Sequence, residues 1–249
     1  MSATVKPRYG KMLEKLSRSR LMLPKDGKTI LGYFFWNLIN KIIIAFHFRG
    51  KITVEGQHHI PAGGPFILIA NHSARWDGPL VQHILNRRAN YMVSPNEMKG
   101  LQGAAVLSVG AFPAHPRLNP VGFALQQLEA GEPVVVFPEG NVFYDGVIHP
   151  FKTGVAKIAL HARKNHFEIP IVPVYIEYQQ QNKSYSAKVV IGTPIRVHDL
   201  PAHEGNVKHA QRAISEELFD SVVALRDGAS PQQKDIAVEE EPVELRCSA

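Results

Sequence analysis

The chain has 249 residues, of which 45% are hydrophobic and 20% charged, a composition ordinary for a globular protein and sufficient for one α/β domain with additions. Its single cysteine, Cys247, excludes a disulfide framework and a cysteine nucleophile in the core, and suits a reducing compartment. The net charge of +6 arises in residues 1–50, where ten Lys or Arg face Glu14 and Asp26, so we expect a basic N-terminus and no nucleic-acid-binding face.

The N-terminal part predicts a membrane-associated helix. A basic segment, residues 1–28, could hold a short surface helix and leads into the most apolar stretch, residues 30–48. That stretch is close to spanning length, but its polar residues fall within one half of a helical wheel. A wide apolar face with a basic lead-in suits a helix lying in one leaflet. The alternative is a buried core helix of a soluble protein, in which the basic lead-in would have no role.

The remainder alternates strands with helices, which predicts an α/β sheet with helices on its faces. Strands are expected at 52–55, 66–70, 91–94, 108–115, 133–137, 169–178 and 187–197, and helices at 79–88, 101–107, 119–130, 153–163 and 207–225. Two prolines predict that strand 169–178 is strained, or near a sheet edge, at its start. The acidic end, 229–249, is predicted to be a disordered tail. The expected organisation is therefore a segment 1–48, an α/β domain 49–228 and the tail.

The first chemical stretch follows the strand at 66–70, an apolar run typical of a strand buried on both faces. His72 comes directly after it, and Asp77 lies one tight turn further on. A carboxylate that accepts from one imidazole nitrogen fixes the other nitrogen as a proton acceptor. The pair therefore predicts a general base for a substrate hydroxyl. The alternatives are a helix-capping Asp77 and an ordinary loop histidine.

The second stretch follows the strand at 133–137, where Glu139 could accept from a substrate hydroxyl or cap the backbone of its own loop. Further along, Lys152 precedes a helix whose first-turn N–H groups could join it in holding a phosphate. Arg117 is a second candidate cation. Either cation could instead be a solvated surface charge. The other histidines show no ligand spacing around His72, so no metal site is expected.

Four stretches, in this order and over residues 50 to 198, resemble the glycerolipid acyltransferase family. The family's first motif is N-H-x-x-x-x-D, the second holds Gly, Phe and Arg, the third is F-P-E-G, and the fourth is an apolar segment with a central proline. The matching positions are Asn71, His72 and Asp77; Gly110, Phe112 and Arg117; Phe137, Pro138, Glu139 and Gly140; and residues 171–174, with a P-F-K-x-G match that contains Lys152.

The resemblance implies a mixed, largely parallel sheet flanked by helices, and acyl transfer to a lysoglycerolipid, most simply 1-acylglycerol 3-phosphate. His72, held by Asp77, would take the proton of a glycerol hydroxyl that attacks an acyl-CoA or acyl-carrier-protein thioester, with no cofactor and no acyl-enzyme. The resemblance places Asn71, Gly110, Phe112, Arg117, Glu139, Gly140 and Lys152 at the substrate. Residues 141–143 read Asn-Val-Phe where the lysophosphatidic acid enzymes usually have Thr-Arg-Ser.

That departure leaves the acceptor open to another lysolipid, a glycolipid or an ornithine lipid. A non-enzymatic lipid-binding protein on the same scaffold is the rival from another class, although binding alone has no need of a base. The expected partners are a lipid acceptor, a thioester donor and a membrane surface. The expected location is a membrane, on its cytoplasmic face.

Overall fold

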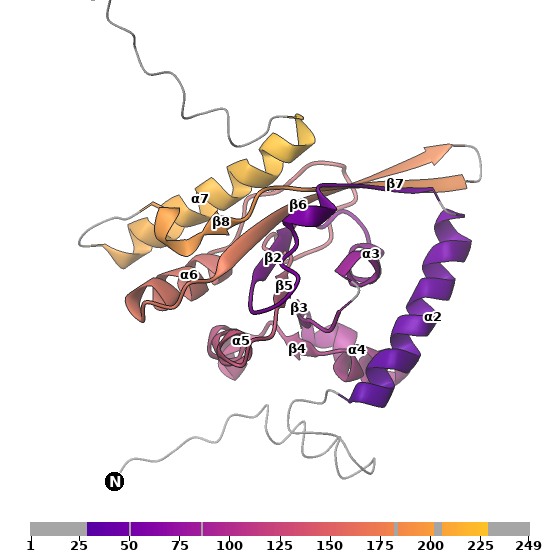
Figure 1. The fold of residues 1–249 in the computed structure, drawn as a ribbon, viewed down its shortest axis with the longest axis horizontal. Helices are drawn as coiled ribbons and strands as arrows, with labels where there is room; N and C mark the ends of the chain where they lie inside the picture. Colours follow the sequence, from indigo (N-terminus) through magenta and orange to yellow (C-terminus); the bar gives the residue numbers. More distant parts are fainter. Residues whose placement is uncertain (1–28, 50, 86, 182–183, 202–205, 229–249) are drawn as a thin grey trace, which may run out of the picture.

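The computed structural model describes residues 29–49, 51–85, 87–181, 184–201 and 206–228. It confirms the α/β class: one eight-stranded sheet carries helices on both faces (Figure 1). The surface helix predicted within residues 1–28 and the tail predicted at 229–249 lie outside the described residues.

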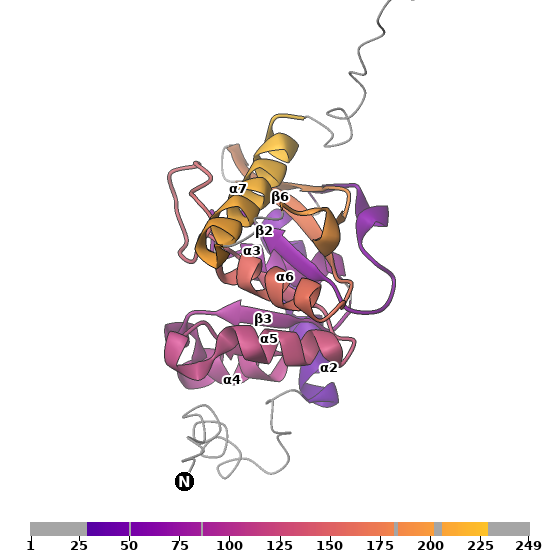
Figure 2. The same ribbon diagram turned by 90° about the vertical axis from the view of Figure 1, so that its left-hand side faces the viewer.

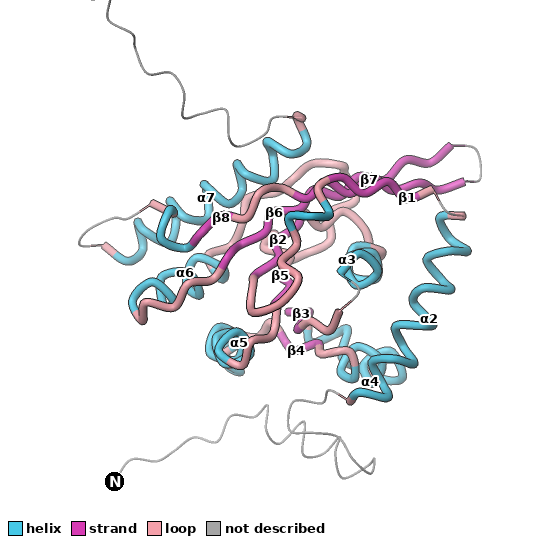
Figure 3. The backbone as a smooth tube through the Cα atoms, viewed as in Figure 1, coloured by secondary structure: helices cyan, strands magenta, loops and turns pink. Residues whose placement is uncertain are grey.

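The sheet runs in the order β1-β7-β6-β2-β5-β3-β4, and β8 pairs with β6 beside this path (Figure 3). Adjacent strands are parallel except where β6 meets β7 and β8, so the sheet is mixed and largely parallel, as expected. The strands are β1 (Ile52–Glu55), β2 (Ile67–Ala70), β3 (Asn90–Val93), β4 (Ala111–Pro113), β5 (Val134–Val136), β6 (Pro170–Gln181), β7 (Ser184–Ile191) and β8 (Ile195–Arg196).

Helices cover the two faces of the sheet as two groups (Figures 1 and 2). The group α5, α6 and α7 packs on the face to which Ile67 and Ile69 of β2 point, and α2 and α3 pack on the face of Leu68 and Ala70. Strand β2 is therefore buried on both faces. The helices are α2 (Ile30–Phe48), α3 (Asp77–Leu85), α4 (Gly100–Ser108), α5 (Pro120–Glu129), α6 (Gly154–Lys164) and α7 (Val207–Arg226), with short 3-10 turns at Gln57–His59, Pro95–Met98, Pro116–Leu118 and Val197–Asp199.

The position predicted for the start of β6 is wrong, because this strand lies inside the sheet rather than at an edge. It pairs with β2 on one side and, in succession, with β8 and β7 on the other. Pro173 falls between the end of the β8 pairing at Ile171 and the start of the β7 pairing at Val174. A proline is tolerated there because its missing N–H coincides with the change of neighbour.

Two other expected strands are shorter than predicted. The span 187–197 is divided into β7 and β8 by Gly192, Thr193 and Pro194, and the amide of Gly192 donates to the carbonyl of Pro173 at 2.8 Å. Of the span 108–115, Ser108 still belongs to α4 and only Ala111–Pro113 forms a strand. Tertiary pairing, which local sequence does not encode, sets these ends.

Helix α2 turns its polar half toward the protein and its apolar half outward. The Asn40 amide donates to the carbonyl of Pro79 at 2.8 Å, while Gln82 of α3 donates to the Tyr33 hydroxyl and to Asn37. The exposed apolar side chains are Ile30, Leu31, Phe34, Phe35, Leu38, Ile42, Ile43 and Phe46. The helix is long and apolar enough to cross a membrane by length and composition, and its apolar face is not core.

Candidate active site

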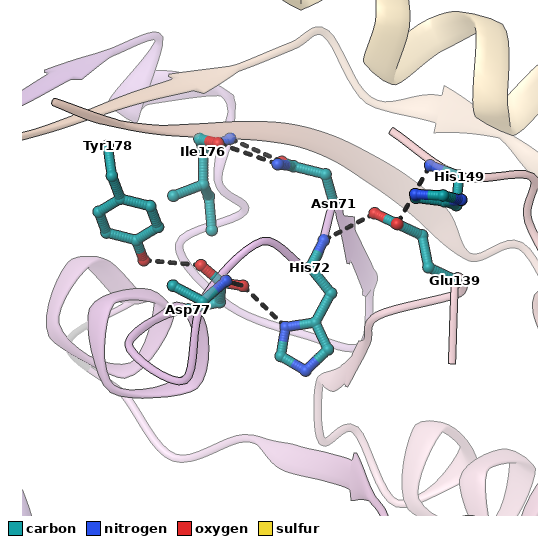
Figure 4. Close-up of polar contacts among 8 residues, drawn as sticks. Asn71, His72, Asp77, Glu139, His149, Ile176 and Tyr178 are labelled. Carbon is teal, nitrogen blue, oxygen red and sulfur yellow. Dashed lines mark hydrogen bonds and ion pairs between the residues drawn. The ribbon is translucent and has the colours of Figure 1, made fainter. Parts of the chain in front are cut away.

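The predicted His72–Asp77 pair forms at the carboxyl end of β2, where the chain turns into α3. The Nδ1 atom of His72 lies 2.7 Å from Oδ2 of Asp77 (Figure 4). Asp77 is fully buried as the first residue of α3, and 20% of the His72 side chain is exposed. The carboxyl ends of parallel strands are where open α/β sheets bind ligands. The pair therefore has one member inside the protein and one at its surface.

Two contacts hold the ring of His72, and a third holds its backbone. Phe137 stacks on it, with ring centroids 4.3 Å apart and planes 20° apart. Asp77 holds Nδ1, and the backbone amide of His72 donates to Oε1 of Glu139 at 2.7 Å. Nε2 points away from Asp77 (Figure 4), and none of the described residues hydrogen-bonds to it. With Nδ1 carrying the proton toward Asp77, Nε2 has a free lone pair for an incoming hydroxyl.

Asp77 has a second side-chain partner, which reasoning from the sequence missed. Its Oδ1 accepts from the hydroxyl of Tyr178 on β6 at 2.6 Å, and its Oδ2 also accepts from the amide of Ala74 at 2.9 Å. Burial and then the adjacent Asp77 charge raise the pKa of Tyr178 far above its ordinary value, so the phenol stays protonated and donates. The only sequence signal for Tyr178 is a polar aromatic residue near the end of an apolar strand.

Asn71 connects the two strands that carry these groups. Its side-chain amide donates to the carbonyl of Ile176 at 2.9 Å, and its Oδ1 accepts from the amide of the same residue at 2.7 Å. The side chain is 4% exposed. Asn71 replaces a backbone partner for β6 where β2 ends, and its contact with the substrate stays a prediction. In this structure it ties the His72 loop to the strand of Tyr178.

Glu139 lies after β5 and accepts from two backbone amides. Oε1 takes the amide of His72 and Oε2 takes that of His149, at 2.7 and 3.1 Å. The residue is 3% exposed, and burial raises its pKa, an effect that the two amides partly offset. Of the two interpretations left open by the sequence, the structure therefore shows backbone capping, which joins the loop after β2 to the loop after β5.

Lys152 and Gly140 meet directly beside Glu139. Gly140 has a φ of 75°, and a Cβ added there would lie 2.3 Å from the Nζ atom of Lys152. The backbone amide of Lys152 donates to the carbonyl of Pro138 at 2.8 Å, and α6 begins two residues after Lys152. The positive φ favours glycine at this position, whereas the flexible end of Lys152 could move away from a Cβ. An exposed ammonium therefore lies next to the Glu139 loop and near a helix N-terminus.

The comparisons with known proteins agree with this geometry. A family model described as Acyltransferase matches residues 51–177, which is half of the chain and contains the loops of His72 and Glu139. The chain belongs to the Acyltransferase family. The enzyme class expected from the sequence is thereby confirmed at the level of the family.

Individual relatives of this family member are distant. It is 24% identical to human 1-acyl-sn-glycerol-3-phosphate acyltransferase alpha over 189 residues, and 24% identical to the bovine protein over 189 residues. Each match covers 68% of this chain but only 65% and 64% of the relative, slightly less than two thirds of its length. The crystal structure of the 1-acyl-sn-glycerophosphate acyltransferase PlsC from Thermotoga maritima is similar with a TM-score of 0.55 and 19% identity, covering 86% of this chain and 88% of that one. This likeness supports the fold.

The second family motif is not brought to the His72 loop by any described contact. Phe112 is 1% exposed and packs in the core against Phe123, and Gly110 is buried in the turn between α4 and β4 with a φ of 108°. Phe112 therefore packs the core and Gly110 forms a turn, and their contact with substrate stays a prediction. Arg117 is exposed in the 3-10 turn Pro116–Leu118, where a cation can still meet a ligand.

Proposed function

We propose that this family member transfers a fatty acyl group from an acyl thioester to the free hydroxyl of a lysoglycerolipid, most simply 1-acylglycerol 3-phosphate, to give phosphatidic acid. The observation that carries the proposal is the 2.7 Å contact between His72 and Asp77, with the opposite ring nitrogen pointing away from Asp77 (Figure 4). The names of the human and bovine relatives and of the PlsC structure support this acceptor.

The reaction follows from the state of the imidazole. Nε2 of His72 takes the proton as the acceptor oxygen attacks the thioester carbonyl carbon, and Asp77 stabilises the imidazolium that forms. The tetrahedral intermediate collapses with cleavage of the C–S bond, and the departing sulfur takes the proton back from Nε2. The product is an ester and a free thiol, and the base is regenerated without an acyl-enzyme.

Binding of the acceptor is assigned to the charges around this loop. Lys152 lies beside Gly140, and its backbone amide donates to Pro138 in the same loop as Glu139. Arg117 is the further candidate, from the second motif. We propose that they hold the phosphate of the acceptor. We assign Asn71, Glu139, Gly110 and Phe112 to shaping the loops rather than to touching the lipid.

The direct test is an in vitro transfer assay with purified protein. Lysophosphatidic acid, a neutral lysophospholipid, a glycolipid and an ornithine lipid would each be offered with acyl-CoA and with acyl-carrier protein. We expect the highest kcat/KM with lysophosphatidic acid. Equal or better use of another acceptor would move the assignment to that lipid, and no transfer with any pair would favour a non-enzymatic lipid-binding role.

The base is tested by His72→Ala, which should lower transfer by at least about 100-fold because proton removal is lost. The matched control is His209→Ala, an exposed histidine at the start of α7. Circular dichroism and thermal unfolding would show that both variants are folded. Near-normal transfer by His72→Ala would remove the mechanism.

We also propose that α2 lies in the cytoplasmic leaflet of a membrane with its apolar face down. Deleting residues 1–48 would test this poorly, since Ile44 and Phe48 are fully buried against the domain. Replacement of the most exposed pair, Leu31→Ser with Phe46→Ser (84% and 80% exposed), leaves the packed face intact. Loss of two large apolar side chains should weaken binding to anionic vesicles by at least about tenfold. Val207→Ser on α7, 65% exposed, is the control, and equal sedimentation of all three proteins would contradict the proposal.

A further inference from the structure

Tyr178 is the one hydroxyl donor to the His72–Asp77 pair among the described residues. It reaches Oδ1 of Asp77 across 101 residues of chain, at 2.6 Å. The other oxygen, Oδ2, is shared by His72 and by the amide of Ala74. Each carboxylate oxygen thus has a defined direction, one into the active-site loop and one toward β6. The matched range of the family ends at residue 177, one residue before this tyrosine.

We propose that Tyr178 is a positioning residue for the acyl transfer: its hydroxyl sets the rotation of the Asp77 carboxylate and, through it, the direction of the His72 ring. The proposal rests on the function proposed above. Tyr178 does not touch the acceptor or the thioester in this assignment. It acts only through Asp77.

Burial explains why the hydroxyl matters. Asp77 is fully buried, so water is not available at Oδ1 to replace a lost donor. A carboxylate held at one oxygen alone can rotate about its Cβ–Cγ bond, and the angle at which it meets Nδ1 then varies. The bond from Tyr178 removes that freedom, which keeps Nε2 pointed at one place in the site.

The tyrosine ring is itself fixed by the end of α2. Phe48, which is fully buried, stacks on Tyr178 with ring centroids 6.0 Å apart and planes 20° apart. Phe48 also meets Trp76, the residue before Asp77, edge to face at 6.2 Å, and His47 stacks on the same Trp76 at 4.0 Å. The last turn of α2 therefore supports Asp77 from two sides, through its hydrogen-bond partner and through its chain neighbour.

The bond also divides the negative charge of the carboxylate. Among the described residues, three titratable side chains lie next to the pair: Tyr178 on β6, Glu139 after β5 and His47 on α2. Glu139 contacts the pair only through the backbone amide of His72, and His47 stacks on Trp76. With the Tyr178 hydroxyl removed, more charge is left on the oxygen facing Nδ1. The imidazolium form of His72 is then better stabilised by the oxygen that faces it.

The experiment compares Tyr178→Phe with Tyr175→Phe. Both lie on β6 and lose one phenolic oxygen, but Tyr175 packs on the opposite face, with α5, α6 and α7. For Tyr178→Phe we expect kcat about tenfold lower with KM unchanged, and changed chemical shifts of the His72 ring. The acidic limb of the kcat profile should also move to higher pH. Tyr175→Phe should show neither change.

The chemical shifts of the His72 ring would be read by NMR of ¹³C-labelled histidine in the full-length protein, with the His72→Ala spectrum as the assignment. If the His72 ring shifts and the kcat profile of Tyr178→Phe match those of Tyr175→Phe, the proposal is overturned. The NMR shift does not depend on turnover, so it distinguishes failure of the positioning proposal from failure of the proposed function. A protein without transferase activity but with the shift would refute the proposed function and leave the positioning of His72 by Tyr178 standing.

Discussion

The loops after β2 and β5 each place a buried carboxylate near the same histidine, yet they use it differently. Asp77 accepts from two side chains, His72 and Tyr178, whereas Glu139 accepts from the backbone amides of His72 and His149. Both residues are almost without contact with solvent. The two carboxylates differ in the kind of group that donates to them, rather than in their burial or in the length of their hydrogen bonds.

This difference in donors gives the two carboxylates different roles, one in proton transfer and one in holding the loops. A side-chain partner such as imidazole can gain or lose a proton, so a carboxylate bonded to it changes the energy of that step. A backbone amide never releases its proton in the working range of pH, so the two hydrogen bonds of Glu139 hold its loop to that of His72 without taking part in proton transfer. The comparison predicts that substitution of Asp77 lowers turnover more than stability, and that substitution of Glu139 lowers stability more than turnover.

The largest effect is expected for Asp77→Asn. The amide is nearly the same size, but its NH₂ group can neither stabilise an imidazolium nor fix the productive tautomer of His72. We expect kcat to fall by at least about 100-fold with little change in KM. Steady-state kinetics with the preferred acceptor would measure it. A variant that keeps half of the wild-type kcat would show that Asp77 only caps α3, the alternative that its place at the first turn leaves open.

A smaller effect on activity and a larger one on folding are expected for Glu139→Gln. One of its two oxygens becomes an NH₂ group that faces a backbone N–H, either that of His72 or that of His149. An unsatisfied buried donor costs about 1–3 kcal/mol, which urea unfolding can resolve. The reverse result, unchanged stability with turnover lower than in Asp77→Asn, would restore the predicted direct contact between Glu139 and the substrate.

The smallest expected effect is a pH dependence carried by Glu139 alone. Burial raises its pKa in the folded protein, so the folded state binds this proton at a higher pH than the unfolded chain does. Lowering the pH through that raised pKa should therefore stabilise wild type relative to Glu139→Gln, and the gain should be complete below the unfolded pKa. Unfolding free energies of the two proteins between neutral pH and pH 4 would measure it. A relative loss for wild type over this range would mean that the two amides outweigh burial.

Local features of the site were predictable because they depend on short stretches of chain. His72 and Asp77 are five residues apart across one turn, so any strand-to-helix connection there brings them close. The same holds for α2, whose apolar and polar halves follow from helical spacing alone. The partner of Asn71 was not predictable, and the role of Glu139 stayed open between two alternatives, because their partners lie 105 and 67 residues away.

By itself, the amino-acid sequence determined the alternating strands and helices, the base and its acidic neighbour, and the family to which they point. Tertiary structure alone decided that β6 runs inside the sheet, that Tyr178 arrives at Asp77, and that the polar half of α2 faces inward against α3. The reason is physical: hydrophobic periodicity and turn chemistry act over a few residues, whereas strand order and register bring together groups from opposite ends of the chain.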